Sequence, residues 1–558
     1  MSKKKDFLTR VFEVYPGLVA WFVITLPIWG GFLFPNFVAY FILVFNAFWV
    51  YKSLSSVLFF VIGYFRIRDA ENTNWMAKLK NLDNSEESIA EIEERIEELK
   101  QKKYSDADFD RGRLKKIPRF AKRLLFIIGR LKAEKHLQNE IKKLDEIDER
   151  NLLDWKEVRH IVIIPYWKEP IEVLRRNLDK LANQTFPNER ISVVLGAEER
   201  HPPAYEMGLK LQKEYSGKFE HVWVNNHTLH GEDIVGKASN MADAGKLANE
   251  KIKELGWNKD KITITSCDCD TQFDEKYFAY VTYLFVTDKD RYTHFYAAPM
   301  VYYANFWKVP FYSRVANTSF TINNIATSAR ADKFIQVSSY SFSWKLLEDI
   351  DFWSVDIIPE DFHMFFKALF KHGDDVITMP IYLKNLSDAA ESIGHAGTIK
   401  NQYEQVKRWA WGVSDHGWMM RTLFKSDKKT FYMFYRVFHT IFDHLTWSII
   451  SFILMFGANI PTLINKKFSN TVFGQKLPKV SSFMMTIGTV TFIITIILDL
   501  FLKPRRKEKV SIFKFLTEQI QWITFPYVTF IFGAIPGLDA QTRLLFGKYM
   551  EYRLTEKH

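Results

Sequence analysis

Asp268 and Asp270, separated by one residue, are the side chains of this sequence best placed to bind a metal ion. Residues two apart in an extended chain point the same way, so both carboxylates can approach one hard divalent cation that also holds a diphosphate. Two other Asp-x-Asp copies occur, at 288–290 and 349–351, and such a pattern is more often a solvated turn. Only the first copy follows a buried-strand pattern, at 261–266, so it is the predicted metal site.

A carboxylate that could act as a general base occurs in two Glu-Asp pairs, at 348–349 and 360–361. The second pair opens a predicted helix over 362–370, where the helix dipole helps to keep a carboxylate ionised. Asp361 is therefore the predicted base, with helix capping as the alternative role. His363 is expected to be packed or exposed rather than a further ligand.

Strand-like and helix-like stretches alternate around these acidic residues. The apolar runs at 160–165 and 191–196 predict buried strands, and 171–182 between them predicts a helix, which together make a βαβ unit. The run at 261–266 supplies a further strand that leads directly to Asp268. Ligands of open α/β sheets bind beyond the carboxyl ends of the strands, so the aspartates are expected at that edge.

The first apolar stretch is long enough to cross a membrane twice. No charged residue lies between Val14 and Tyr51, which is 38 positions, whereas one spanning helix needs about 20 residues. Pro35 and Asn36 lie in the middle, so a helical hairpin is predicted. A cleavable signal peptide is disfavoured, because the stretch is too long and lacks a small-residue cleavage pattern.

Three more uncharged stretches lie near the C-terminus, at 445–465, 481–498 and 519–538. The first two predict spanning helices. The third contains two prolines and two glycines and has basic residues on both sides. A re-entrant or interfacial segment is therefore an alternative to a third span.

The basic residues indicate orientation and partners. They flank the N-terminal hairpin at 3–10 and at 52–68, while its turn is uncharged. By the positive-inside bias both ends face the cytoplasm, which predicts a multi-pass protein of the cell membrane with 66–430 in the cytoplasm. The net charge of the chain is +11, its basic residues lie beside the membrane segments, and no nucleic-acid-binding motif occurs. Anionic membrane lipids and a nucleoside diphosphate are expected as partners, and nucleic acid is not.

A charged arm follows the hairpin. Residues 85–100 contain seven glutamates, with Ile89, Ile92, Ile96 and Leu99 in a short heptad-like stripe. A helical hairpin arm is predicted, and a homo-oligomer contact through 85–103 is the alternative. Basic and apolar residues then alternate from Arg111 to Lys135, which predicts an amphipathic helix that packs on the acidic arm or lies on the membrane.

With 558 residues the chain is too long for one compact domain. The predicted parts are a transmembrane hairpin (1–65), a charged helical arm with a basic amphipathic helix (66–150), an α/β domain (151–430), a membrane region of two or three helices (431–538) and a basic tail (539–558).

Five landmarks, in order, resemble those of integral-membrane family 2 glycosyltransferases related to the processive synthases, such as cellulose and hyaluronan synthase. The resemblance covers about 155–425 and implies a GT-A-like α/β domain. The landmarks are Pro165 to Glu169, Gly236-Lys237-Ala238-Ser239-Asn240, the Asp-x-Asp at 268, the Glu-Asp pair at 360, and Gln405-x-x-Arg408-Trp409.

The resemblance also implies roles for individual residues. Asp268 and Asp270 would bind Mg²⁺ or Mn²⁺, and Asp361 would deprotonate the acceptor. The nucleotide sugar would contact Pro165, Glu169, Glu198, Lys237 and Asp268, and the acceptor or diphosphate would contact Glu360, Gln405, Arg408 and Trp409. An indole can stack on a sugar ring and a guanidinium can hold phosphate oxygens, so the residue types suit these roles.

Two positions depart from the family pattern. Glu198 stands near the place of a usual aspartate that contacts the base of the nucleotide, and Trp167 stands where tyrosine is common. Neither change affects the predicted metal ligands or the predicted general base. The implied activity is inverting transfer of a sugar from a nucleotide-diphosphate sugar to a growing polysaccharide or glycan. The alternatives are single transfer to a lipid carrier and an inactive membrane scaffold.

Overall fold

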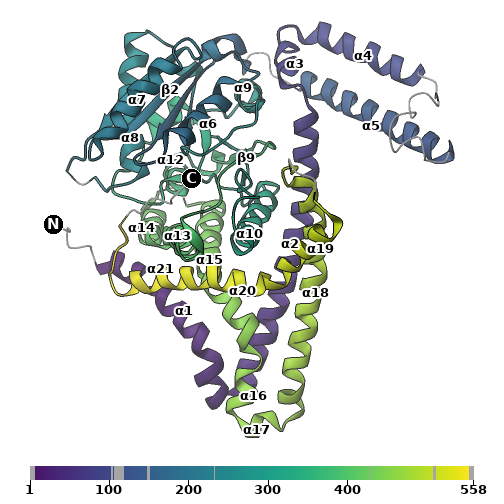
Figure 1. Cartoon of the computed structure of the whole chain (residues 1–558), viewed down its shortest axis with the longest axis vertical. Coiled ribbons are helices and arrows are strands. Elements are labelled where there is room, and N and C mark those ends of the chain that lie inside the picture. The colour runs from purple at the N-terminus through teal and green to yellow at the C-terminus, as the bar shows by residue number, and fades with distance from the viewer. Residues whose placement is uncertain are drawn as a thin grey trace. The chain divides into compact units, whose positions relative to one another are not determined.

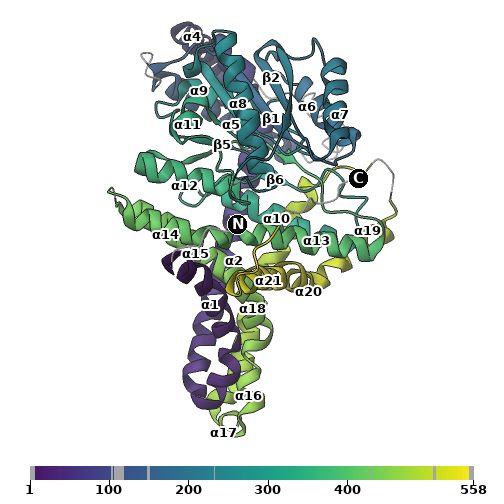
Figure 2. The same ribbon diagram turned by 90° about the vertical axis from the view of Figure 1, so that its left-hand side faces the viewer.

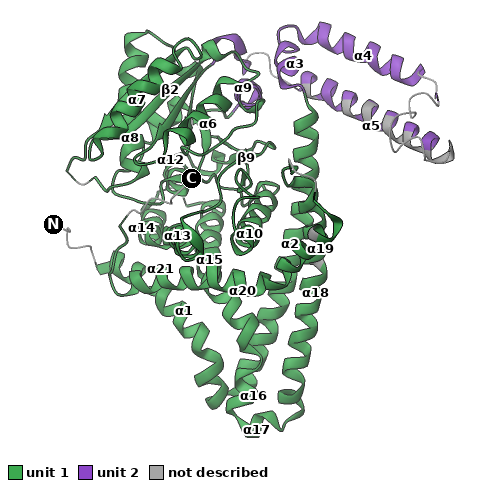
Figure 3. Cartoon of the chain, viewed as in Figure 1, with its two compact units in different colours: residues 1–73, 159–277, 290–558 green, residues 74–158, 278–289 purple. Residues whose placement is uncertain are grey.

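The computed structural model describes residues 7–101, 105, 119–146, 151–231, 233–427, 429–506 and 510–551. The chain forms two compact units, shown in Figure 3. The larger comprises residues 1–73, 159–277 and 290–558, and the smaller comprises residues 74–158 and 278–289.

A seven-stranded mixed sheet is the centre of the larger unit, with strand order β3-β2-β1-β4-β7-β5-β8. Strands β1 to β4 run parallel, and β7 is antiparallel to its neighbours β4 and β5. The strands are β1 (Arg159–Pro165), β2 (Ile191–Glu198), β3 (His221–His227), β4 (Ile262–Ser266), β5 (Phe295–Ala297), β7 (Tyr340–Ser343) and β8 (Thr378–Pro380). Two short strands, β6 (Met300–Val301) and β9 (Asn385–Leu386), pair separately.

The predicted βαβ unit is confirmed, with helix α6 (Ile171–Ala182) between β1 and β2. Strand β1 is buried over Ile161 to Ile164, as expected for a parallel strand that is covered on both faces. Because β7 is antiparallel to β4, it begins where β4 ends, with Tyr340 opposite Ser266. The segment that precedes β7 therefore lies at the same sheet edge as the segment that follows β4.

Helices pack on the sheet, among them α7 (Pro202–Glu214), α8 (Lys237–Glu254), α11 (Trp344–Asp349) and α12 (Glu360–His372). The hydrophobic core between them and the sheet also takes in Met433, Val437 and Ile441 of α15 (Phe431–Phe452). This apolar helix is thus part of the core of the α/β domain.

His160 on β1 supports a prediction about pH. Its ring is fully buried, and its Nδ1 lies 2.5 Å from Thr263 Oγ1. Burial lowers the pKa of His160 to about 3. Because the unfolded chain takes up a proton near pH 6.5 and the folded chain does not, the free energy of unfolding should fall as pH decreases below 6.5, by about 2 kcal/mol at pH 5.

The measurement is the apparent melting temperature of detergent-purified protein at pH 8 and at pH 5. His160→Gln should lose less stability between these values than wild type, whereas replacement of the exposed His395 by Gln should not change the difference. Equal losses in wild type and His160→Gln would contradict the prediction.

Five helical segments of the described chain are long and apolar enough to cross a membrane. Four of them run in the same general direction away from the sheet (Figures 1 and 2). They are α1 (Phe7–Leu33), α2 (Pro35–Asn72), α15 with its π-helical continuation to Gly457, and α18 (Val472–Leu502). The turn between α1 and α2 and the short helices α16 (Ile460–Ile464) and α17 (Lys466–Ser469) lie at the end far from the sheet.

The fifth segment, Phe515–Leu545, lies across the direction of the other helices instead of running beside them (Figure 1). Along its length Trp522 contacts Phe492 of α18, Phe530 contacts Phe452 of α15, and Leu538 packs in a cluster with α1. It is built from short pieces, α19 (Ile512–Gln519), α20 (Phe525–Thr529) and α21 (Ile535–Leu545), joined by 3₁₀ and π turns. Whether this segment spans the membrane, re-enters it or lies at its interface stays a prediction.

Close packing between α2 and α10 (Phe311–Ser328) supports a second prediction. A Cβ atom on Gly63 would lie 2.7 Å from the Ile325 carbonyl oxygen, so the helix backbones would have to move apart. Gly63→Ala should lower the free energy of unfolding by about 1–3 kcal/mol.

Gly488 of α18 is the matched control, because a Cβ there would meet only Ser53 Oγ, at 3.9 Å. Gly488→Ala should be neutral or slightly stabilising, since alanine favours a helix over glycine. Apparent melting temperatures in detergent compare the two variants. A Gly63→Ala protein as stable as Gly488→Ala would show that the contact is not constrained.

The smaller unit contains α3 (Trp75–Lys80), α4 (Ser85–Gln101), α5 (Arg119–Asp145) and most of α9 (Tyr277–Thr287). Helix α4 packs against α5, and Ile92 and Ile96 of the heptad-like stripe are buried. Positions 102–104 and 106–118, which include the start of the predicted basic helix, lie outside the described residues. The predicted dimer contact through 85–103 stays a prediction, and part of its stripe is already covered within the unit.

Candidate active site

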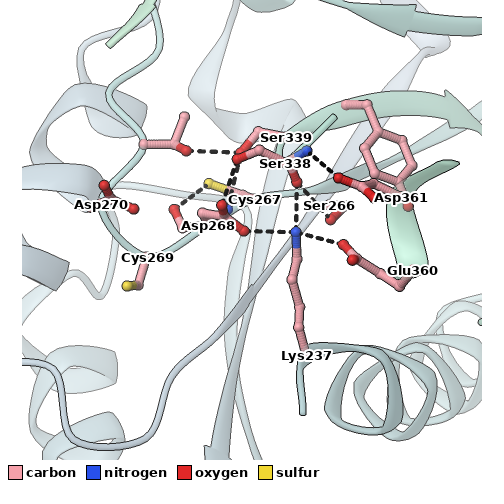
Figure 4. Close-up of polar contacts among 12 residues, drawn as sticks. Lys237, Ser266, Cys267, Asp268, Cys269, Asp270, Ser338, Ser339, Glu360 and Asp361 are labelled. Atoms are coloured by element: carbon pink, nitrogen blue, oxygen red, sulfur yellow. Dashed lines mark hydrogen bonds and ion pairs between the residues drawn. The ribbon is translucent and has the colours of Figure 1, made fainter. Parts of the chain in front are cut away.

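Lys237 is the centre of a polar cluster where β4 ends and β7 begins (Figure 4). It is the first residue of α8, and its Nζ lies 2.7 Å from Asp268 Oδ1 and 2.8 Å from Glu360 Oε1. The same ammonium donates to the Ser338 carbonyl oxygen at 2.6 Å. One lysine therefore joins the loop after β4, the start of α12 and the segment before β7.

Burial and charge decide the protonation of this cluster. Burial alone would lower the pKa of Lys237, but the carboxylates of Asp268 and Glu360 raise it well above its usual value. Burial raises the pKa of Glu360 to about 7, although Lys237 opposes the shift. Lys237 is thus a permanent cation, and Glu360 is a buried group whose charge depends on that cation.

Asp361, the predicted base, is the second residue of α12. Its Oδ2 accepts a hydrogen bond from the Ser338 N–H at 3.0 Å, and its Oδ1 accepts one from the Phe362 N–H at 2.9 Å. The competing Glu-Asp pair lies elsewhere, because Glu348 is paired with Lys259.

Ser338 was not found from the sequence, yet it contacts three groups of the cluster. Its hydroxyl donates to Asp268 Oδ2 at 2.5 Å, its N–H donates to Asp361, and its carbonyl accepts from Lys237. Its φ of 63° is in the left-handed region, which a residue other than glycine seldom adopts. A single serine before a strand has no spacing pattern, so no local signal marks it.

Asp270 has different partners from Asp268. It is fully buried, and its Oδ2 accepts hydrogen bonds from Ser387 Oγ at 2.5 Å and from the Asp388 N–H at 2.9 Å. In Figure 4 it lies away from the Lys237 contacts. The carboxylate oxygens suit a hard divalent cation. Within the described residues, however, Asp268 and Asp270 are not part of a group of three or more potential ligands close enough to share one ion.

The predicted nucleotide contacts form a chain of interactions beyond β1 and β2. Glu169 accepts a hydrogen bond from the Trp167 N–H at 2.7 Å, and the Arg200 guanidinium lies 4.1 Å from the centre of the Trp167 ring. Glu198 accepts from Arg200 and from Asn240 Nδ2, each at 3.0 Å. The two loops thereby meet at one edge of the sheet.

The same contacts reach the acidic loop. Glu169 Oε1 lies 3.4 Å from Cys269 Sγ, between the two aspartates of the Asp-x-Asp. Pro165, the last residue of β1, pairs with Gly196 of β2. The structure therefore places the first-strand loop, Glu198 and the Asp-x-Asp beside one another.

Gln405, Arg408 and Trp409 lie on α13 (Gly394–Ala410). The Trp409 ring contacts Tyr302 and Phe320, with centroid distances of 5.4 and 5.0 Å. Gln405 Oε1 accepts from Gln402 Nε2 at 3.5 Å. Trp409 is thus held in an aromatic group within the protein.

The segment after α13 contacts the helix that carries Asp361. Asp415 Oδ2 lies 2.8 Å from His363 Nδ1, and a Cβ on Gly412 would lie 3.0 Å from the Phe362 ring. His363 is 3% exposed and also contacts Trp418, so it is a packed residue, as expected. The segment that follows the acceptor candidates therefore packs on the helix that carries the base candidate.

Arg436 of α15 is a second residue that the sequence analysis missed. It is 2% exposed, and its guanidinium donates to the carbonyl oxygens of Asp332 and Phe334, both at 2.9 Å. The segment continues to Gln336, whose Nε2 donates to the Asp361 carbonyl oxygen at 3.2 Å. A membrane-length helix thus anchors the segment that carries Ser338.

Residues 263–501 match the model of glycosyl transferase family group 2. The match begins in β4, ends in α18 and includes the Asp-x-Asp, Asp361 and Gln405 to Trp409. A search of curated proteins found no match.

Several solved structures are similar to parts of the chain. A mannosyltransferase from Pyrobaculum calidifontis in complex with GDP-Man and Mn²⁺ has 14% identity and a TM-score of 0.37, with 70% of this chain and 88% of that chain covered. A fragment of S. aureus TarS in complex with UDP-GlcNAc has 11% identity and a TM-score of 0.30, with 71% and 93% covered.

The predicted fold class, an α/β GT-A-like domain combined with membrane-length helices, is confirmed by the mixed sheet, the family match and the five apolar helical segments. The predicted relation to processive synthases stays a prediction.

Proposed function

We propose that this chain is a membrane-embedded inverting glycosyltransferase that transfers a sugar from a nucleotide-diphosphate sugar to a growing polysaccharide or glycan. The observation that carries the proposal is the cluster of Lys237, Asp268, Glu360 and Asp361 at the sheet edge where ligands of α/β proteins bind. Three of these four residues also lie within the family match.

Asp361 is the proposed general base. Its carboxylate is held by two backbone N–H groups, and an aspartate so held can accept the proton of an acceptor hydroxyl as the oxygen attacks the anomeric carbon. One direct displacement inverts the anomeric centre and requires no covalent intermediate. Lys237, a buried cation, and Arg408 are the proposed protein groups that stabilise the negative charge of the departing diphosphate.

Asp268 and Asp270 are the proposed ligands of Mg²⁺ or Mn²⁺. When bound, such an ion neutralises diphosphate oxygens and stabilises the leaving group. Asp268 suits this role because its side chain is 30% exposed at the sheet edge, whereas Asp270 is fully buried and needs a local change of its hydrogen bonds. Our proposal therefore gives Asp268 the first contact with the cation.

Glu198, with Asn240 and Arg200, is the proposed recognition group for the nucleotide, together with the loop from Pro165 to Glu169. Trp409 is proposed to present its ring to an acceptor sugar, and Gln405 and Glu360 to line the same site.

We place the α/β domain in the cytoplasm of a cell-membrane protein. Four apolar helices that leave the sheet in one direction, with basic residues at the sheet-facing ends of the first hairpin, support this orientation. The apolar surface of these helices supports contact with lipid, since Leu18, Phe37, Phe483 and Phe501 are exposed.

The test is nucleoside diphosphate release by detergent-purified protein with lipid extract, Mg²⁺ or Mn²⁺ and a panel of nucleotide sugars. One donor should give release that Asp268→Asn reduces to the protein-free level. Asp351→Asn is the matched control, because Asp351 belongs to another Asp-x-Asp and is exposed. No release from any donor, or equal release from wild type and Asp268→Asn, would contradict the proposal.

The size of the product decides between the remaining alternatives. A ladder of long chains supports a processive synthase, whereas one added sugar on a lipid supports the single-transfer enzyme. A scaffold would show neither product.

A further inference from the structure

The left-handed conformation of Ser338 suggests a role beyond loop structure. A residue other than glycine persists at positive φ only where its surroundings hold it there, and such residues concentrate at functional sites. With φ at 63°, the Ser338 N–H faces Asp361, while its carbonyl faces Lys237 and its hydroxyl reaches Asp268.

Residues on both sides of Ser338 are fixed to other parts of the cluster. Ser339 Oγ accepts from the Asp268 N–H at 3.0 Å and lies 2.8 Å from Thr271 Oγ1. On the other side, Gln336 donates to the Asp361 main chain and accepts from Thr378 Oγ1 at 2.8 Å. The residue is therefore clamped between the acidic loop and the start of α12.

We propose that Ser338 is a positioning residue that holds Asp268 and Asp361 in one arrangement, its hydroxyl acting on Asp268 and its left-handed backbone acting on Asp361. The inference deepens the proposed function and rests on it, because that function assigns the metal to Asp268 and the acceptor proton to Asp361.

The hydroxyl can orient Asp268 without competing for the cation. A carboxylate oxygen has more than one lone pair. Asp268 Oδ2 can therefore accept the Ser338 hydrogen bond while the same oxygen, or Oδ1, contacts a metal ion. Metal-ligating carboxylates are commonly hydrogen-bonded in this way, and loss of the partner lowers metal affinity or activity by about 10- to 100-fold.

The backbone contribution is separable from the hydroxyl. Alanine at 338 removes the hydroxyl and keeps the Cβ, which disfavours the positive φ of this position. Glycine also removes the hydroxyl but adopts positive φ without that steric cost, so its N–H would stay directed toward Asp361. Metal affinity should therefore depend on the hydroxyl alone, and turnover should depend on both.

The experiment measures Mn²⁺ affinity by electron paramagnetic resonance, and kcat and KM by nucleoside diphosphate release, on the full chain in detergent. Ser338→Ala and Ser338→Gly should both weaken Mn²⁺ binding by about tenfold or more. Their kcat should differ, with alanine lower than glycine at similar donor KM, because only alanine strains the left-handed backbone that directs the N–H to Asp361.

Asp351→Ala is the control for alanine at a left-handed position as such. Asp351 has a φ of 55° and an exposed side chain, so this variant should match wild type in Mn²⁺ affinity and kcat. The same losses in Asp351→Ala would overturn the proposal, because they would show a general effect of strain at a left-handed residue.

Failure of the inference and failure of the proposed function are distinguishable. Wild-type Mn²⁺ affinity in both Ser338 variants overturns the role of the hydroxyl even if the enzyme is active. If wild type binds Mn²⁺ but releases no diphosphate, the proposed function and the claim about Asp361 fail together, while the affinities still decide the claim about Asp268. Equal Mn²⁺ binding by wild type and Asp268→Asn overturns the assignment of the metal and the inference with it.

Discussion

Asp361→Asn is expected to lower kcat by about 10²- to 10⁴-fold, the range by which a positioned general base accelerates proton transfer. The amide keeps an oxygen that can accept from the Ser338 N–H, so the start of α12 should stay in place. Asparagine cannot take up the acceptor proton, and the chemical step should therefore fail. Donor binding should change little, because Asp361 is not assigned to the nucleotide.

The measurement is nucleoside diphosphate release at saturating donor, with donor binding followed separately by isothermal titration calorimetry. Asp349→Asn is a matched control, since Asp349 also follows a glutamate at the end of a short helix but belongs to the pair that contacts Lys259 through Glu348. This control should retain wild-type turnover. If Asp361→Asn kept most of its activity, another group would have to accept the proton.

Lys237→Met is expected to lower the free energy of unfolding by about 3–5 kcal/mol, the usual cost of removing one partner of a buried ion pair. Glu360 is 7% exposed on its side chain and would lose its cation, while Asp268 would lose one of its donors. Because burial already raises the pKa of Glu360 to about 7, the variant can protonate this group at pH 6. The loss should therefore be larger at pH 8 than at pH 6.

Chemical unfolding in detergent at the two pH values measures this effect. Lys246→Met, at an exposed position of the same helix α8, controls for the removal of a lysine. The double variant Lys237→Met, Glu360→Gln should recover part of the lost stability, because it no longer buries a carboxylate without a counterion. If Lys237→Met were as stable as Lys246→Met, the ion pairs of Lys237 would contribute nothing to the stability of the fold.

Much of the α/β domain could be predicted because its signals are local. The apolar run before Pro165 is a buried strand, and the segment that begins at Glu360 is a helix, since strand and helix patterns depend on residues a few positions apart. The sheet edge that holds Asp268 followed from the rule that parallel strands share a carboxyl edge. The roles predicted for individual site residues stay predictions that the experiments above address.

The membrane segments show what hydropathy does not predict, which is how an apolar segment packs on its neighbours. Hydropathy predicted the apolar stretch at 519–538 but left open whether it spans or lies at an interface. The course of the segment in the fold depends on its neighbours, because Trp522, Phe530 and Leu538 contact three different helices in turn. Its relation to the membrane stays a prediction.

The sequence by itself determined the order of strands and helices, the apolar segments and the acidic pairs, since each is set by neighbours along the chain. Tertiary structure alone decided that Glu360 and not Glu348 meets Lys237, that Asp268 and Asp270 have separate partners, and that Ser338 joins the metal candidate to the base candidate. These contacts form because an antiparallel strand enters the sheet beside β4 and brings residues some 70 positions apart to one edge. The spacing of these residues along the chain does not predict these contacts.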